Sequence, residues 1–159
     1  MKIIIYGILI ASAMLVPTRP LELGKLKPVE TILIEKCDDG ILIKTDTGDI
    51  GRGRTVNQAI WNLHETTAGT VYLDTAEYLL LPSDETVLKQ MCPYLRETVR
   101  ISQWAGEVEL EEAAKYLDVH KPNVQLKAYQ EGMSLQVLEE ENGRFRLREK
   151  TIERREKRT

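Results

Sequence analysis

The sequence predicts an α+β fold: a single domain with a mixed β-sheet, about three helices packed on it and a C-terminal β-hairpin. Three observations predict this class. A chain of 159 residues, 42% of them hydrophobic, is long enough to bury a core of its own. Short β-branched apolar runs alternate with segments of helical periodicity. Two turn signals typical of β-hairpins, Asp39-Gly40 and Asn142-Gly143, lie near the two ends of this regular region.

The expected domain spans residues 21–148, between an N-terminal segment, 1–20, and a charged tail, 149–159. The tail has no apolar face to bury, so we expect it to be flexible. In the N-terminal segment, Lys2 precedes fourteen uncharged residues, IIIYGILIASAMLV, and Ala11-Ser12-Ala13 has the form of a signal cleavage site. This run is shorter than the ~20 residues of a typical membrane span, and a buried strand is the alternative. We expect residues 1–20 to be a signal peptide or a membrane anchor, which would make the domain extracytoplasmic.

The charge distribution argues against a nucleic-acid partner. The net charge is −3, but the last sixteen residues carry eight Lys or Arg and three acids. The rest of the chain is therefore acidic and should repel a polyanion.

The first half of the domain reads as a hairpin followed by a helix. Residues 29–36 and 41–47 are β-branched apolar runs on either side of the Asp-Gly turn, and they predict two antiparallel strands. Thr55 and Gln58 have the spacing of a capping box, and a helix follows that ends near Gly69. Its apolar positions recur at i, i+3, i+4 and i+7, namely Val56, Ala59, Ile60 and Leu63.

Residues 70–82, TVYLDTAEYLLLP, predict one central strand with a bulge at Asp74-Thr75. Because a strand–helix–strand crossover nearly always joins parallel strands, we expect this strand to run parallel to the one before the helix. A second helix follows Pro82, with Ser83 as its N-cap and Pro93 as its end or kink.

The last third of the domain contains a predicted strand at 98–104 and a predicted helix at 107–119, whereas 124–130 fits either element. The turn of the final hairpin also sets its register. It predicts two cross-strand charge pairs, Glu141 with Arg144 and Glu139 with Arg146.

Residues for metal or cofactor chemistry are few. Cys37 and Cys92 match neither a C-x-x-C motif nor a metal-ligand spacing, and His64 and His120 have no further ligand nearby in sequence. We therefore expect no metal and no cofactor. Burial as small hydrophobes is the favoured interpretation of the two cysteines, and whether they pair stays open.

Catalytic motifs are also missing from the sequence. Asp46-Thr47-Gly48 has the letters of an aspartic-protease loop, but Asp74-Thr75-Ala76 lacks the glycine that a second loop would need. No serine stands in a G-x-S-x-G elbow. We assign no catalytic residue and expect a protein that is not an enzyme.

The first candidate site directly precedes the first helix and consists of Gly51, Arg52, Gly53, Arg54 and Thr55. Free N–H groups at a helix start attract anions, and the two arginines add positive charge. However, the segment lacks both the Gly-Lys-Ser/Thr ending of a P-loop and the third glycine of a dinucleotide fingerprint. We favour a structural turn here and keep anion binding, in a small ligand-binding domain or enzyme, as the alternative.

The second candidate site is a possible partner contact on the first helix, formed by Asn57, Trp61 and His64. On a helical wheel Trp61 lies well away from the apolar stripe. A tryptophan in this position either packs under a loop or belongs to a binding surface, where exposed aromatic side chains are enriched.

Residues 29 to about 118 resemble the N-terminal domain of the C-subunit lipoproteins of spore germinant receptors. The likeness rests on a hairpin, the turn Gly51-Arg52-Gly53-Arg54-Thr55, a helix with Ala59 and Leu63, and the strand around 71–81. The family's lipidated cysteine has no counterpart before Cys37, the family is longer, and it has a histidine in the strand after the helix where this chain has Asp74-Thr75. The resemblance implies an extracytoplasmic, non-enzymatic module that contacts a membrane-associated protein partner in sporulation or germination. The oligomeric state stays open.

Overall fold

The computed structural model describes residues 26–149. The predicted signal peptide or anchor, 1–20, therefore lies outside the described residues, as does all but the first residue of the predicted tail, 149–159. Within the described range the predicted fold class is confirmed, because a mixed sheet carries three α-helices and ends in a β-hairpin.

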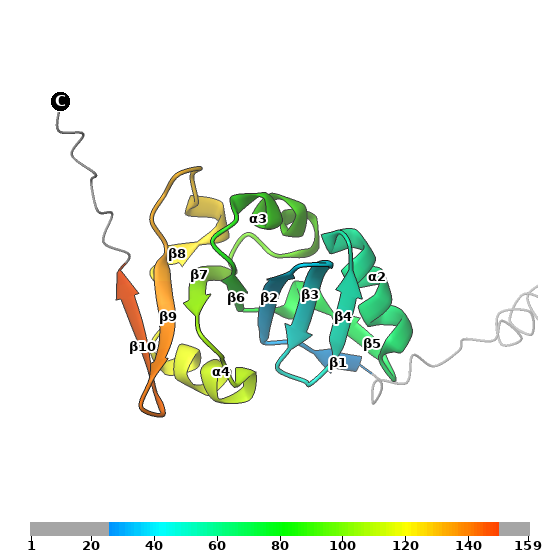
Figure 1. The fold of residues 1–159 in the computed structure, drawn as a ribbon, viewed down its shortest axis with the longest axis horizontal. Helices are drawn as coiled ribbons and strands as arrows, with labels where there is room; N and C mark the ends of the chain where they lie inside the picture. The colour runs from blue at the N-terminus through cyan, green and yellow to red at the C-terminus, as the bar shows by residue number, and fades with distance from the viewer. Residues whose placement is uncertain (1–25, 150–159) are drawn as a thin grey trace, which may run out of the picture.

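An eight-stranded mixed sheet forms the centre of the molecule (Figure 1). Its strands are β2 (Thr31–Cys37), β3 (Gly40–Thr45), β4 (Ile50–Gly53), β6 (Tyr78–Leu81), β7 (Arg100–Ala105), β8 (Val124–Gln125), β9 (Gln136–Glu141) and β10 (Arg144–Glu149). They lie in the order β10-β9-β7-β6-β2-β3-β4, with β8 paired to the start of β7. The four central strands β2, β6, β7 and β9 are parallel, and antiparallel hairpins add β3 and β4 at one edge and β10 at the other.

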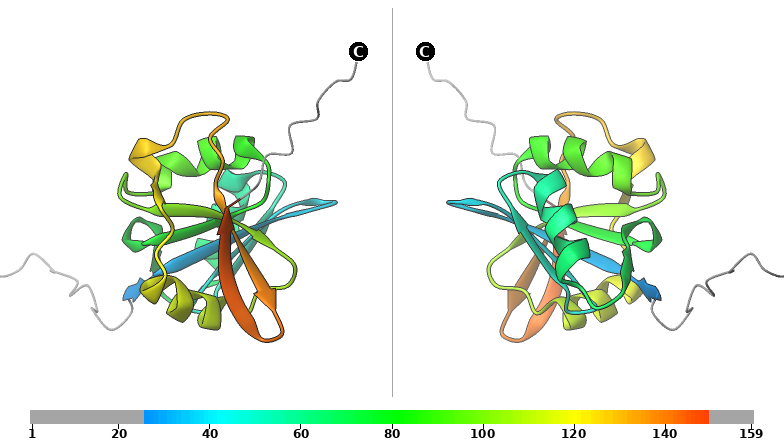
Figure 2. Two further views of the ribbon diagram at one scale, coloured as in Figure 1. Left: turned by 90° about the vertical axis from the view of Figure 1, so that its left-hand side faces the viewer. Right: turned by 90° about the vertical axis from the view of Figure 1, so that its right-hand side faces the viewer.

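Helices cover both faces of this sheet (Figure 2). The helices α2 (Val56–Thr66) and α3 (Glu85–Met91) pack on one face, and α4 (Leu110–Val119) packs on the other. The alternation of side chains along β2 separates the two cores, since Ile32 and Ile34 point to the α2 side and Leu33 to the α4 side. A further pair of short parallel strands, β1 (Leu26–Pro28) and β5 (Thr70–Tyr72), lies apart from the main sheet.

The segment 70–82 is not one strand, and the prediction of a single bulged strand is wrong. It contains β5, a 3₁₀ turn at Leu73–Thr75 and then β6, which pairs in the other sheet. The cause is the Thr75 hydroxyl, which lies 2.7 Å from the Tyr72 carbonyl oxygen and accepts the N–H of Val29 at 2.9 Å. A side chain that satisfies the backbone in this way favours a turn over a continued ladder.

The prediction of parallel strands around the first helix is wrong for the predicted strand 41–47, because β3 runs antiparallel to β2 and β6 runs parallel to β2. The strand directly before α2 is β4, which the sequence did not reveal. Its antiparallel pairing with β3 makes β4 run parallel to β6.

Two other local predictions need correction. Asp84, not Ser83, caps α3, because its carboxylate accepts the N–H of Thr86 at 2.9 Å and also pairs with Lys36 at 2.8 Å. Cys37 and Cys92 are both free and exposed, so the expectation that they are buried is wrong.

The segment 124–130, which the sequence assigned to either a helix or a strand, contains a short piece of each: β8 is followed by a 3₁₀ turn at Leu126–Ala128. In the final hairpin the predicted register is confirmed, with Glu141 opposite Arg144 and Glu139 opposite Arg146. Asn142 and Gly143 have the positive φ values of 56° and 71° that a type I′ turn requires. Pro93 follows the end of α3, as predicted.

Candidate interaction surface on α2 and β4

The segment Ile50–Gly53 is the edge strand β4, so the predicted turn over residues 51–55 is wrong for residues 51–53, and the chain bends only at Arg54 and Thr55. Gly51 and Gly53 face α2 at very short range. A Cβ atom at Gly51 would collide with the carbonyl oxygen of Ala59, and one at Gly53 would collide with the Ala59 backbone nitrogen. The two glycines are therefore required because the helix lies directly against the strand.

This close approach lets α2 cover the outer edge of β4. The N–H of Arg52 donates to the side-chain oxygen of Asn62 at 2.9 Å, and the N–H of Arg54 donates to the side-chain oxygen of Gln58 at 3.0 Å. The Thr66 hydroxyl lies 3.4 Å from the carbonyl oxygen of the first residue of β4. Gln58, Asn62 and Thr66 are spaced four residues apart, so they form one row along the helix. Sequence reasoning missed this row, although its spacing beside a Gly-x-Gly segment was visible.

Two N–H groups at the start of α2 donate to the protein's own side chains. Thr55 is the N-cap of α2, as predicted, and its hydroxyl accepts the N–H of Gln58 at 3.3 Å. The Gln58 side chain is turned to Arg54 rather than back to Thr55 as in a full capping box. An anion bound beside Thr55 would therefore compete with two existing hydrogen bonds, those donated by the N–H groups of Arg54 and Gln58.

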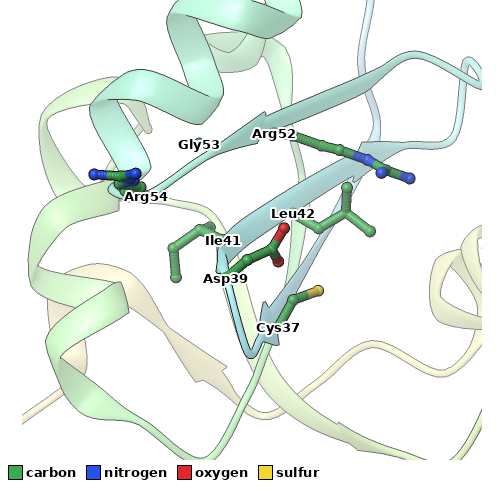
Figure 3. Close-up of a pocket in the computed structure, with 7 residues that line it drawn as sticks. All are labelled: Cys37, Asp39, Ile41, Leu42, Arg52, Gly53 and Arg54. Atoms are coloured by element: carbon green, nitrogen blue, oxygen red, sulfur yellow. The ribbon is translucent and has the colours of Figure 1, made fainter.

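A hollow of about 440 Å³ lies beside the first candidate site (Figure 3). It is lined by Cys37, Asp39, Ile41, Leu42, Arg52, Gly53 and Arg54. In Figure 3 the side chains of Arg52 and Arg54 extend in opposite directions, so the two guanidinium groups do not converge on one point. This geometry does not favour a single bound anion, and anion binding at residues 51–55 stays a prediction.

Trp61 lies on the outer side of α2, and 66% of its surface is exposed. The four apolar residues predicted to face the core are all buried, so the rotation of the helix is as the sequence predicted. Of the two interpretations of Trp61, packing under a loop is wrong. By contrast, Trp104 is partly buried, and its indole N–H donates to the carbonyl oxygen of Ile34 at 3.0 Å.

The structure brings the two candidate sites together. A second hollow, of about 550 Å³, is lined by Arg52, Gly53, Arg54, Gln58, Trp61 and Asn62. It therefore combines residues of the first candidate site with the tryptophan of the second. We call the exposed side chains of Arg52, Arg54 and Trp61, with the hollow between them, the α2–β4 surface.

Asn57 and His64 share the outer face of α2 with Trp61 but differ in their contacts. The side-chain oxygen of Asn57 accepts the hydroxyl of Tyr94 at 3.1 Å, which ties α2 to the 3₁₀ turn Cys92–Tyr94. His64 is exposed in the last turn of the helix. Asn57 therefore has a structural contact, whereas His64 extends the exposed face.

Residues 26–149 hold neither a candidate membrane span nor a candidate metal site. No helix in this range is long and apolar enough to cross a membrane. The same range holds no group of three or more His, Cys, Asp or Glu side chains that could bind a metal ion.

Comparison of the chain with protein-family models, with curated proteins and with solved structures found no match.

Proposed function

We propose that this protein is a non-enzymatic interaction module, exported or tethered to a membrane, that binds a protein partner through the α2–β4 surface. The observation that carries the proposal is the 66% exposure of Trp61 on a helix whose other large apolar residues are buried. Tryptophan and arginine are the residues most enriched among those that dominate binding energy at protein interfaces.

The rigid setting of Trp61 supports a binding role. Of its neighbours in the hollow, Asn62 accepts a hydrogen bond from Arg52 of β4, and Gln58 accepts one from Arg54, which directly follows that strand. A side chain presented from a fixed helix loses less conformational entropy on binding than one on a mobile loop. Because the edge of β4 is already closed, a partner would contact side chains here rather than extend the sheet.

The proposed location and biological setting rest on sequence features. The apolar segment within residues 1–20 supports export or anchoring, and the resemblance to the C-subunit lipoproteins of germinant receptors supports a role in sporulation or germination. Both features favour a partner that is itself associated with the membrane.

A second candidate function is the binding of an anionic group at residues 51–55. It is favoured by the two exposed arginines that border both hollows. It is disfavoured because the two guanidinium groups do not converge and because the N–H groups of Arg54 and Gln58 already donate hydrogen bonds. Titration with sulfate or a nucleotide, followed by amide NMR, tests it: shifts confined to Gly53 and Thr55 would favour this candidate over the protein partner.

Site-specific photo-crosslinking tests the leading proposal. A photoreactive amino acid replaces His64, beside the intact Trp61, in the full-length protein expressed in its native membranes. The matched control carries the same group at Val119, which is 73% exposed at the end of α4. We expect a discrete protein adduct from position 64 that disappears when Trp61→Ala is added. The same adducts from both positions would contradict the proposal.

A further inference from the structure

The edge of the sheet opposite to β4 is open. β10 pairs with β9 on one side, and no other strand within residues 26–149 lies on its outer side (Figure 1). The N–H of Leu147 donates to the hydroxyl of Tyr116 at 3.3 Å instead of to β9. Because alternate residues of a strand direct their backbone groups to alternate sides, those of Phe145, Leu147 and Glu149 face outward.

The two edge strands of the sheet therefore differ in how far side chains cover their outward backbone groups. At the β4 edge, side chains of α2 accept the N–H groups of Arg52 and of Arg54, which directly follows the strand, and the Thr66 hydroxyl lies 3.4 Å from the carbonyl oxygen of Ile50. On β10, within the described part of the chain, Tyr116 is the one side chain that contacts an outward backbone group. An edge strand with free N–H and C=O groups can accept a further strand.

The side chains of β10 define which strand would fit. Arg144, Arg146 and Arg148 occupy one face of the strand, whereas Phe145 and Leu147 lie on the other face, partly buried against the α4 core. The strand already bound to β10 follows this pattern in part: β9 places acids opposite Arg144 and Arg146 and Leu138 opposite Leu147. It departs from the pattern at Glu140, opposite Phe145, and at Val137, opposite Arg148.

A second copy of β10 does not fit this pattern. Residues directly opposite each other in an antiparallel pair share a face, so two copies would set arginine opposite arginine at every second position. Like charges directly opposite are destabilising. Glu139 and Glu141 pair with Arg146 and Arg148, but Arg144 makes no ion pair within the described residues.

We propose that the outer edge of β10 binds an extended acidic segment of a partner protein by strand addition. Acidic residues at alternate positions of that segment would face the arginines, and apolar residues between them would lie beside Phe145 and Leu147. This site lies at the opposite end of the sheet from the α2–β4 surface and is independent of the function proposed for that surface.

The test uses the full chain and a synthetic hexapeptide that alternates glutamate and valine. A hexapeptide that alternates lysine and valine is the control probe. With the acidic peptide at millimolar concentration, we expect amide NMR shifts at Phe145, Leu147 and Glu149 and slower hydrogen exchange there. The lysine peptide should produce neither change.

A pair of charge-reversal variants makes the test specific. Arg144→Glu should weaken binding of the acidic peptide by about threefold, the size expected of one cross-strand charge pair. Arg52→Glu, on the opposite edge strand, should leave it unchanged. Equal shifts with both peptides, no shifts with either, or equal weakening by the two variants would overturn the proposal.

Discussion

The backbone N–H of Arg52 donates a 2.9 Å hydrogen bond to the side chain of Asn62, and this bond joins the edge of the sheet to the helix that covers it. An uncovered edge strand would offer its backbone groups to other chains. Because the donor is on β4 and the acceptor is on α2, the bond also fixes the rotation of the helix. This rotation keeps Trp61 outward.

Replacing Asn62 tests this relationship. In Asn62→Ala the N–H of Arg52 loses its partner, so its hydrogen exchange should accelerate. The free energy of unfolding should fall by about 1 kcal/mol, less the gain in helix propensity from alanine. Glu65→Ala, at an exposed position of the same helix, is the control and should change neither quantity. Unchanged exchange at Arg52 in Asn62→Ala would show that the bond does not form in solution.

The glycines of β4 should be intolerant of any side chain. Gly51→Ala forces a methyl group into the backbone and side chains of α2, so we expect a loss of about 3 kcal/mol in the free energy of unfolding. Gly106→Ala is the control: it adds a methyl group in open space, where only the φ of +86° opposes it, at about 1 kcal/mol. Chemical denaturation compares the two variants. Equal losses would mean that α2 does not lie as close to β4 as described.

These two variants also show what could and could not be predicted from the sequence. The rotation of α2 and the register of the last hairpin follow from local signals, namely the i, i+3, i+4 spacing of apolar residues and an Asn-Gly turn. Local signals do not reveal that Gly51 and Gly53 lie in a strand. A Gly-x-Gly sequence before a helix occurs both in a turn and in a strand that a helix contacts closely, so the sequence alone does not distinguish the two. Only the position of Ala59 against them distinguishes the two cases.

The candidate site could likewise be predicted only in part, namely in its residues but not in their grouping. Its individual residues, Trp61 and the two arginines, stand out in the sequence by type and helical position. Their common hollow depends on the pairing of β4 with β3 and on the packing of α2, which are tertiary contacts. The break between β5 and β6 was missed for a related reason, because the Thr75 hydroxyl bonds to Val29, which lies far away in sequence.

The phenol of Tyr78 offers a test of the α4 core. Burial raises the pKa of Tyr78 to about 12, and its hydroxyl has no hydrogen-bond partner among the described residues. Tyr78→Phe therefore removes no hydrogen bond, and the free energy of unfolding at neutral pH should stay within about 1 kcal/mol of the unmodified protein. A larger loss would reveal a partner for the hydroxyl.

The same group predicts a pH dependence. A raised pKa means that the folded state favours the neutral phenol, so its contribution to stability is complete below the unfolded pKa of about 10. This contribution is lost as the pH rises from there through about 12. In that interval the unmodified protein should lose stability relative to Tyr78→Phe, as measured by denaturation at several pH values. Parallel curves for the two proteins would contradict the burial of an ionisable group at this position.

The proposed function requires that the exposed face of α2 binds a protein partner through Trp61. The most direct measurement is quantitative capture from native membranes with the full-length protein, Trp61→Ala and Val119→Ala. Both substitutions remove an exposed apolar side chain, so both should leave the free energy of unfolding within about 0.5 kcal/mol of the unmodified protein. We predict that Trp61→Ala loses a captured protein that Val119→Ala retains. Retention of the same proteins by all three would contradict the claim.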